Sequence, residues 1–565
     1  MRVLFIARHF TYFRNYESVI EMLAARGHEV HLAAEREERL GGHEMVERLA
    51  SAHPGISFGW IPDREDRWVT FATGLRRTID YLRYLDRAYE TTPKLRERAR
   101  ERVPRLALWL LAVTPFRTKA GRRVANAALR ACEAAIPHSR TIDAYLREQN
   151  PDVLLLTPLI GVVASPQPDY LQSAKALGLP TALCVWSWDH LSSKAIVRSV
   201  PDRVFVWNET QRDEAVKLHG VPPEQVIVTG AQCFDQWFGR SPSTDGAAFC
   251  RTVGLRQGRP FILYVCSALF RGSASEALFV ERWIHALRSS GLDPLVSTPI
   301  LVRPHPARTK EWANVDLSAA GDVAVWGRNP VDADAKAEYF DSLYHSAAIV
   351  GLNTSAFLEG GIVGRPIFAT LLPEHHENQE GTIHFHYLLQ VGGGLLHASR
   401  TLGQHFEQLN EALGDHGRES ARSRRFVEAF IRPHGLGVAA TPVFADAVET
   451  LARAPAAEPA VVSLGTRLLQ LVMTPVAAVV AFEALDPLVS SERDRAIASR
   501  SRARHVRAEK AWREKRAREA AEQHDKESRA AARQRQKVKR AAEWRRTKMT
   551  KQLTERIKRG IGLER

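Results

Sequence analysis

Residues 347–368, AAIVGLNTSAFLEGGIVGRPIF, contain the pattern that decides the fold. A continuous apolar run enters a polar turn at residues 353–355, a helical segment follows, and a Gly-Arg-Pro break precedes the next apolar run. Continuous apolar runs are typical of strands buried on both faces, and a helix between two such strands implies a right-handed crossover in a parallel sheet. The stretch therefore predicts one βαβ unit of a doubly wound α/β domain.

The same alternation extends along most of the chain, in two blocks. Residues 1–240 contain the apolar runs RVLFIA, HEVHLAA, PDVLLLT, PTALCVWS, RVFVWN and QVIVTG, and residues 241–452 contain PFILYVCS, PILVRPHP, VAVWG, AAIVGLN, PIFAT and GGLLHAS. With 565 residues, the chain is long enough for two domains of roughly 200 residues each and an appendage. We predict an α/β fold with two Rossmann-like doubly wound domains that face a cleft.

Two apolar segments lie outside this alternation. Residues 60–145 form an Arg-rich helical insertion in the first domain, and its apolar run VPRLALWLLAVTP (103–115) is too short to span a bilayer. This run is either a core helix or a patch that docks on a membrane. Residues 453–490 are predicted to be a linker and an apolar helix. The run LLQLVMTPVAAVVAF (468–482) either packs on the body of the protein or lies in a membrane interface.

The basic charge of the protein lies in residues 491–565. This segment holds 26 Lys and Arg against 11 Asp and Glu, a difference equal to the formal net charge of +15, so the rest of the chain is neutral. Residues 488–559 contain neither Gly nor Pro and are rich in strong helix formers, which predicts a long basic helical tail. Its apolar positions are mostly alanine, too small for a convincing coiled-coil seam.

Cysteine usage and the N-terminal sequence favour a cytoplasmic protein. The five cysteines are scattered without the spacing of a zinc site, so we interpret them as buried apolar side chains in a reducing compartment. The N-terminal stretch MRVLFIARHF lacks the features of a secretory signal. We expect a cytoplasmic location, with or without peripheral attachment to the inner face of the membrane.

Two catalytic candidates lie after strands of the first domain, where a doubly wound sheet binds its ligand. His9 follows the first apolar run, and its imidazole could take a proton from an acceptor hydroxyl, although a surface histidine at a helix start has the same pattern. Asp189 belongs to the loop WDHLSSK (188–194), which either orients an acceptor or a phosphate or forms a self-bonded turn that caps the next helix.

The corresponding positions of the second domain are also polar. Two prolines in LVRPHP (301–306) aim Arg303 and His305 out of a strand end, unless the motif is only a structural turn. Arg303 offers a fork for a phosphate, and His305 offers a second donor or a catalytic acid. Ser267 follows the opening strand, where its hydroxyl and the next helix start could meet a phosphate.

The turn at the start of the decisive stretch completes the set of donor-binding candidates. The hydroxyls and backbone N–H groups at the helix start form an anion site, and Glu359, one turn into the helix, could accept hydrogen bonds from ribose hydroxyls. The predicted donor-binding residues are Ser267, Arg303, His305, Asn353, Thr354, Ser355 and Glu359.

A metal site is not predicted. The loop HHENQEGTIHFHYL (375–388) contains four histidines and suggests a metal at first sight, but its spacing resembles no zinc motif and no HExxH is present. Contacts with a donor, or capping of the loop itself, are the preferred roles for these histidines.

The pattern as a whole resembles a known family. Two Rossmann-like domains, a polar loop with His9 after the first strand, RPHP in the second domain and TSAFLEGGIVGRP after it are similar to the GT-B glycosyltransferases. The motifs most resemble bacterial capsule and surface-polymer sugar transferases and CDP-glycerol glycerophosphotransferases, with UDP-sugar 2-epimerases as more distant relatives. The similarity covers about residues 1–450 in architecture.

The resemblance implies a division of labour between the domains. The second domain would hold a nucleotide-activated donor, which is a substrate rather than a cofactor, and the first would hold a hydroxyl acceptor. Bound metal is generally not needed in this family. Its retaining members carry a second acidic residue eight positions before the one that corresponds to Glu359. Here that position is Gly351, which favours an inverting reaction.

Three functions remain open on these grounds. The first is a glycosyltransferase in surface polysaccharide or glycoconjugate synthesis. A glycerophosphotransferase with a CDP-linked donor belongs to this first class. The second is a nucleotide-sugar 2-epimerase that uses the same fold.

The third is a polyanion- or membrane-tethering protein on a degenerate transferase fold, with residues 491–565 as its working part. An anionic membrane surface is the preferred partner of this tail, and a solvated helix without a partner is the alternative. Nucleic acid is not expected, because the tail has no recognised motif and only two aromatic residues, Trp512 and Trp544.

Overall fold

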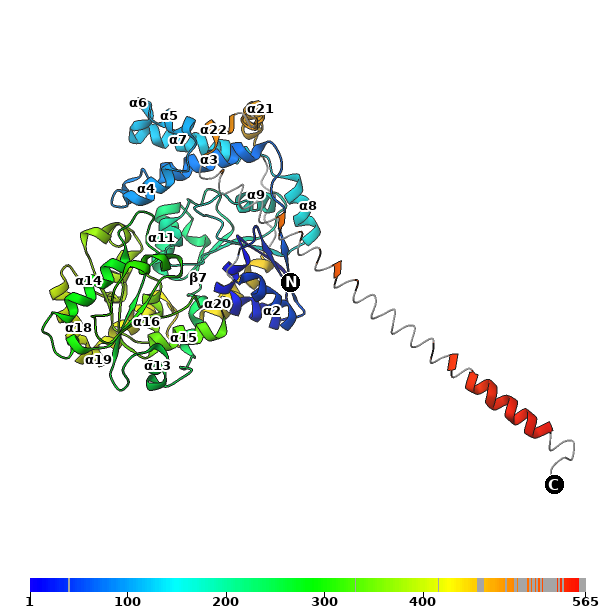
Figure 1. Cartoon of the computed structure of the whole chain (residues 1–565). Helices are drawn as coiled ribbons and strands as arrows, with labels where there is room; N and C mark the ends of the chain where they lie inside the picture. Colours follow the sequence, from blue (N-terminus) through cyan, green and yellow to red (C-terminus); the bar gives the residue numbers. More distant parts are fainter. Residues whose placement is uncertain are drawn as a thin grey trace, which may run out of the picture. The chain divides into compact units, whose positions relative to one another are not determined.

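The computed structural model describes residues 1–38, 41–330, 332–414, 416–454, 462–482 and 485–491, together with 543–557 and scattered positions between 495 and 540. The chain divides into two units, Met1–Ile497 and Ala498–Arg565. In the second unit, the described stretch 543–557 is helical and exposed (Figure 1). Most of the predicted basic tail lies outside the described residues, so a continuous helix over 491–565 stays a prediction.

Seven parallel strands form the first sheet, in the order β3-β2-β1-β4-β5-β6-β7. They are β1 (Arg2–Ala7), β2 (Glu29–Ala34), β3 (Ile56–Trp60), β4 (Val153–Thr157), β5 (Thr181–Cys184), β6 (Arg203–Val206) and β7 (Val226–Val228). Side chains alternate along β1, so that Phe5 joins the hydrophobic cluster on one face and Ile6 the cluster on the other. Both faces are therefore covered, which explains the continuous apolar runs in the sequence.

Six parallel strands form the second sheet, in the order β10-β9-β8-β11-β12-β13. They are β8 (Phe261–Val265), β9 (Ile300–Arg303), β10 (Val323–Val325), β11 (Ser346–Val350), β12 (Ile367–Thr370) and β13 (Leu396–Ser399). Leu263 and Tyr264 of the central strand β8 pack into clusters on opposite faces. Each sheet reverses its strand order beside the first strand of its domain, so the predicted fold class, α/β with two Rossmann-like doubly wound domains, is confirmed.

Helices cover both faces of each sheet and form the predicted insertion (Figure 1). The first domain contains α1 (Glu17–Ala25), α2 (Gly42–Ala52), α8 (Arg140–Gln149), α9 (Gln167–Ala176), α10 (His190–Ser193) and α11 (Glu209–His219). The insertion contains α3 (Trp68–Arg83), α4 (Pro93–Arg100), α5 (Arg105–Leu111), α6 (Thr114–Arg117) and α7 (Lys119–Ala134). The second domain contains α12 (Asp235–Phe238), α13 (Gly246–Val253), α14 (Glu276–Arg288), α15 (Ala333–Tyr344), α16 (Ala356–Ile362), α17 (Phe385–Gln390), α18 (Leu402–Gly414) and α19 (His416–Phe430). Three helices follow: α20 (Ala440–Arg453), α21 (Leu464–Val480) and α22 (Asp486–Val489).

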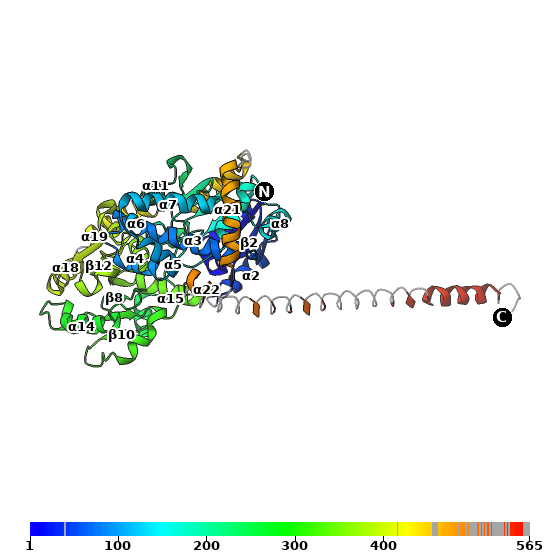
Figure 2. The same cartoon turned by 90° about the horizontal axis from the view of Figure 1, so that it is seen from above.

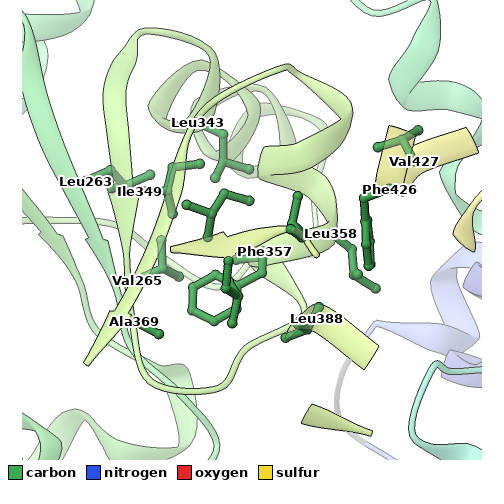
Figure 3. Close-up of a cluster of buried hydrophobic side chains, with 14 of the residues drawn as sticks. Leu263, Val265, Leu343, Ile349, Phe357, Leu358, Ala369, Leu388, Phe426 and Val427 are labelled. Atoms are coloured by element: carbon green, nitrogen blue, oxygen red, sulfur yellow. The ribbon is translucent and has the colours of Figure 1, made fainter. Parts of the chain in front are cut away.

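The decisive stretch forms β11, α16 and β12 and lies in the core of the second domain. Phe357 and Leu358 of α16 are buried among side chains of the sheet and of α19 (Figure 3). Gly360 lets α16 approach the sheet, because a Cβ there would lie 2.5 Å from Cδ1 of Ile349. The close packing of this short helix fixes the position of Glu359 on the same helix.

The chain returns to the first domain after α19. Phe444 and Val448 of α20 belong to the hydrophobic cluster of the first sheet, and α20 packs against α1 (Figure 1). Asp235 anchors this crossing by accepting hydrogen bonds from the backbone N–H of Ala440 (3.1 Å) and of Thr441 (2.7 Å) at the start of α20. The sequence assigned residues 241–452 to the second domain, whereas their last helix packs with the first.

The apolar run of the insertion is not a core helix. It forms α5 and the turn that follows, and no side chain of α5 is buried. The core-helix interpretation of residues 103–115 is therefore wrong. The second apolar run does pack on the body, since α21 contacts α3 and α7 through Met473 and Ala477, but most of its other apolar side chains are exposed. In the described part of the chain, no helix is long and apolar enough to cross a membrane.

Candidate functional site

The carboxyl ends of the two sheets face each other. Trp188, after β5, packs edge-on against His384, at the start of α17, with ring centroids 4.7 Å apart. Arg14, after β1, lies close enough to Glu359 of α16 to lower the pKa of that carboxyl group. The predicted site residues follow these strand ends, so the fold brings candidates from both domains to one junction.

Arg303 is held in a fixed position at the end of β9. Its guanidinium lies over the rings of Trp326, 5.5 Å from the centroid, and Tyr339, 5.1 Å from the centroid. One terminal nitrogen, Nη2, donates to the carbonyl of Arg328 (3.2 Å), while Nη1 is buried and has no hydrogen-bond partner among the described residues. Burial lowers the pKa of Arg303, but a guanidinium remains charged in proteins. The buried Nη1 therefore has hydrogen-bond donor capacity that no described residue uses.

Glu359 is the acidic member of the same cluster. The phenol of Tyr339 donates a short hydrogen bond to its carboxylate. Burial raises the pKa of Glu359 to about 7, against the opposing effects of the Tyr339 hydrogen bond and of Arg14 and Arg303. Its carboxyl group is therefore partly ionised at neutral pH and can accept hydrogen bonds from hydroxyl groups.

His9 supplies a basic nitrogen on the side of the first domain. It precedes the short 3₁₀ helix Phe10–Asn15, and its ring packs edge-on against Tyr12, with centroids 4.6 Å apart. Burial, together with Arg8 and Arg14, lowers the pKa of His9 to about 4, so the imidazole is neutral at pH 7. Nδ1 is buried and has no partner among the described residues. A neutral imidazole with a free nitrogen can accept a proton.

Ser267 and Asn353 are linked inside the second domain. The Ser267 hydroxyl donates to Glu276 (3.2 Å) and accepts from the backbone N–H of Asn353 (3.1 Å). The Asn353 side-chain amide donates to the carbonyl of Asn378 (2.5 Å) and lies 3.5 Å from Nε2 of His384. These bonds use the Ser267 hydroxyl internally, whereas Oδ1 of Asn353 is buried and has no partner among the described residues.

Thr354, Ser355 and His305 lie at the starts of helical turns. The Thr354 hydroxyl accepts weakly from the backbone N–H of Ala356 (3.4 Å), and Ser355, just before α16, is exposed and makes no capping bond with its side chain. Nδ1 of His305 accepts from the backbone N–H of Ala307 (3.2 Å). Burial and Arg308 lower the pKa of His305, so its ring is neutral at pH 7.

Asp189 is saturated by its own loop. Its carboxylate accepts hydrogen bonds from the hydroxyls of Ser187 (2.6 Å) and Ser193 (2.9 Å). It also forms an ion pair with Lys194 (2.6 Å). Burial favours the neutral form, but Lys194, His384 and the Ser187 hydroxyl hold the pKa of Asp189 well below its usual range. The carboxylate is thus ionised and fully engaged, which suits it to fix the loop.

The structure sorts the candidates into two groups. Arg303 and Glu359 interact with each other and, through Arg14, face His9. Ser267, Asn353 and Asp189 are linked through His384, whose pKa is lowered to about 4 by burial. Among the described residues, no side-chain hydrogen bond or ion pair joins Thr354, Ser355 or His305 to either group.

Sequence reasoning missed three residues of this junction. Tyr339 lies inside a helix and carries no sequence signal, because only the packing of α15 against α16 brings it to Glu359. Arg14 follows the His9 loop closely and could have been included with it. His384 belongs to the histidine-rich loop, which was the available signal. In the described part of the chain, no group of three or more His, Cys, Asp or Glu side chains is placed to hold a metal ion.

Among known proteins, only solved structures resemble the chain. No family model and no curated protein matches the chain. Similar solved structures include a glycosyltransferase from Rickettsia africae, with 10% identity, a TM-score of 0.46, and coverage of 80% of this chain and 99% of that one. Another is a UDP-GlcNAc 2-epimerase from Neisseria meningitidis bound to UDP-GlcNAc, with 12% identity, a TM-score of 0.43, and coverage of 80% and 100%. A UDP-GlcNAc 2-epimerase from Methanocaldococcus jannaschii has 11% identity, a TM-score of 0.42, and the same coverage.

The likeness to these structures is remote. At these identities and TM-scores it carries no argument about reaction or substrate, so a functional assignment must rest on the contacts at the junction.

Proposed function

We propose that the protein transfers a sugar from a nucleotide-activated donor to a hydroxyl acceptor. The observation that carries this proposal is the pair Arg303 and Glu359 at the carboxyl end of the second sheet: a buried cation with a free donor nitrogen beside a carboxyl group of raised pKa. The guanidinium of Arg303 can bind a phosphate, and the carboxyl group of Glu359 can accept hydrogen bonds from ribose hydroxyls. The remaining predicted donor contacts would come from His305, Asn353, Thr354 and Ser355. Ser267, whose hydroxyl bonds to Glu276 and to the backbone N–H of Asn353, would hold Asn353 in position.

The first domain supplies the groups that the transfer step requires. Arg14 faces the donor pair, where a second cation would stabilise the negative charge that develops on the leaving phosphate. His9 next to it would take the proton from the acceptor hydroxyl, since its ring is neutral and Nδ1 is unpartnered. In this scheme Asp189 orients the acceptor loop through its bonds to Ser193 and Lys194.

An inverting, single-displacement reaction is part of the proposal. A retaining double displacement would need a second carboxylate near the donor, and position 351 is glycine. The site also has no room for a side chain there, because a Cβ at Gly351 would lie 2.7 Å from the carbonyl oxygen of Val265. Direct attack by the acceptor hydroxyl is the route that the junction supports.

Nucleotide binding by the full chain tests the donor site. We expect UDP, CDP or CMP to raise the melting temperature, and Arg303→Gln to weaken the binding of that nucleotide by about tenfold or more, because a charge-assisted hydrogen bond is lost. Arg365→Gln is the matched control: Arg365 also lies over a tyrosine ring, that of Tyr344 at 5.5 Å, but it precedes β12 at the opposite end of the sheet.

Two outcomes would contradict the proposal: no stabilisation by any of these nucleotides, or equal loss of binding in the two arginine variants. Product analysis then separates the reactions. Release of nucleotide only when a hydroxyl acceptor is present supports sugar transfer, and transfer of glycerol phosphate from a CDP-linked donor supports the phosphotransferase. Inversion at C2 of the sugar without an acceptor supports an epimerase.

A further inference from the structure

An apolar surface covers one side of the helical insertion. It is formed by α5, by the side of α21 that does not touch the body, and by Phe482 just after α21. Four of its large side chains are about two-thirds exposed: Trp109 (67%), Leu471 (69%), Val472 (68%) and Phe482 (66%). We call this surface, with Leu110 and Leu468, the insertion face.

The two helices of the insertion face bury very few of their side chains. Of the 17 residues of α21, only Met473 and Ala477 are buried, against α3 and α7, and α5 has no buried side chain at all. Both figures show α5, α6, α7 and α21 on the same side of the insertion (Figures 1 and 2). Exposed apolar side chains gathered in this way on neighbouring elements mark a contact with another molecule or with a membrane.

The charges around the insertion face select its partner. Residues 102–132, which include α5, α6 and most of α7, contain seven Arg and Lys and no Asp or Glu, and four of the seven are exposed: Arg105, Arg117, Lys119 and Arg123. Between 462 and 482 the only charged residue is Arg467. Arg467 and Arg130 also line a cavity of about 440 Å³ between α7, α9 and α21, whose lining includes one acidic residue, Glu133. Apolar helices bordered by basic side chains complement an anionic lipid surface.

The dimensions of the helices restrict the mode of contact. Neither α5 nor α21 is long enough to cross a bilayer, and α21 contains Pro475 in its second half. A helix that is too short to span but exposes an apolar side can lie in the interface plane, with that side among the acyl chains. A symmetric contact with a second copy is disfavoured, because it would bring two sets of basic side chains together without acidic partners.

We propose that the insertion face docks the protein on an anionic lipid bilayer, with α5 and α21 lying in the interface. The proposal is independent of the donor site and would hold for a transferase or for an epimerase. Docking through this face would place the helical insertion next to the membrane. The insertion belongs to the first domain, which is the domain predicted to hold the acceptor.

Vesicle binding by the full-length chain tests the proposal. Vesicles of phosphatidylcholine alone are compared with vesicles that also contain about 30% phosphatidylglycerol, whose negative charge attracts basic segments. The face variant combines Trp109→Gln, Leu468→Gln and Leu471→Gln, all at exposed positions, where glutamine preserves helix propensity. The control variant combines Leu278→Gln, Val325→Gln and Val438→Gln, which are exposed apolar residues outside the insertion and α21.

We expect the wild type to bind the anionic vesicles more tightly than the neutral ones. The face variant should bind them about tenfold or more weakly because it buries less apolar surface, while the control matches the wild type. Raising the ionic strength to about 0.5 M screens the basic tail, so the difference between face variant and wild type should persist there.

Three results would overturn the proposal: no binding of the wild type to anionic vesicles, equal binding by wild type and face variant, or a wild-type dimer that the face variant converts to a monomer. The last result would assign the face to a second copy of the chain. Nucleotide-induced stabilisation, measured on the same samples, shows that a loss of vesicle binding is not a loss of the folded donor domain.

Discussion

The phenol of Tyr387, in α17 of the second domain, donates a hydrogen bond of 2.5 Å to Glu214, in α11 of the first. Glu214 is buried, and burial raises its pKa to about 8, against the opposing effects of Tyr387, Arg83 and Ser192. One carboxyl group at the contact between the domains is therefore neutral at pH 7.

Glu214 should make the protein less stable as the pH rises. Its folded-state pKa is raised above the unfolded value, so its stabilising contribution is fully present below the ordinary pKa near 4.5 and is lost as the pH rises to about 8. Glu214→Gln removes this titration. Relative to wild type, the variant should gain up to a few kcal/mol in the free energy of unfolding between pH 5 and pH 8.

Denaturant unfolding of wild type and variant at both pH values measures this gain. Glu209→Gln, on the same helix but exposed, should show no such trend. Parallel pH profiles for wild type and Glu214→Gln would mean that Glu214 is ionised in the folded protein.

His9→Gln should separate catalysis from donor binding. If His9 is the base, its replacement lowers kcat by about a hundredfold or more, the usual contribution of general base catalysis, and leaves the Kd of the donor nucleotide unchanged. The wild-type rate should fall only on acidification towards pH 4, where the imidazole becomes protonated. His31→Gln is the control, because burial also lowers the pKa of His31 to about 4, but its Nδ1 contacts Ser57 within the sheet. Similar losses of kcat in the two variants would remove His9 from the reaction.

Donor affinity should depend on the ionisation of Glu359. If its carboxylate accepts hydrogen bonds from ribose hydroxyls, the affinity for a nucleotide sugar, whose diphosphate does not titrate near neutrality, should rise several-fold as the pH increases through about 7. Calorimetric titrations from pH 6 to pH 8 test this.

Variants of Glu359 and of its hydrogen-bond partner Tyr339 test whether Glu359 causes this pH dependence. Glu359→Gln should bind with no pH dependence. Tyr339→Phe removes a hydrogen bond that lowers the pKa of Glu359, so the rise in affinity should move to higher pH. A pH-independent affinity in the wild type would show that ribose does not contact Glu359.

Gly327 should be required because Arg303 lies against its backbone. A Cβ at position 327 would stand 2.7 Å from Cζ of Arg303, and the backbone φ there is +127°. Gly327→Ala should therefore displace the guanidinium and weaken donor binding about tenfold or more, a loss like that of the charge-assisted hydrogen bond itself. Gly321→Ala controls for backbone strain, because φ is +75° but a Cβ would meet only Nε of Arg288 at 4.0 Å.

Both alanine variants should lose about 1 kcal/mol or more of stability from the positive φ, and only Gly327→Ala should lose donor affinity. Thermal unfolding and nucleotide titration measure the two effects separately. Unchanged affinity in Gly327→Ala would place the donor away from Arg303.

Much of the fold follows from local patterns. The continuous apolar runs marked strands of both sheets because a strand covered on both faces must be apolar at successive positions, as in β4, where all five residues are buried. The exposure of α5 could not be predicted from the sequence, because an apolar run of that length looks the same in a core helix and in a helix that faces outward. The return of α20 to the first domain was also beyond the sequence, since its apolar side fits either core.

The sequence by itself determined which polar side chains follow the strands, and therefore that Arg303, Glu359 and His9 lie at the carboxyl ends of two parallel sheets. Only the tertiary structure decided which of these residues contact one another. The stacking of Arg303 on Tyr339, the hydrogen bond from Tyr339 to Glu359 and the approach of Arg14 join residues far apart in the chain. Such contacts depend on how helices pack and how the domains meet, and the pKa values that make the site chemically useful arise from the burial that this packing imposes.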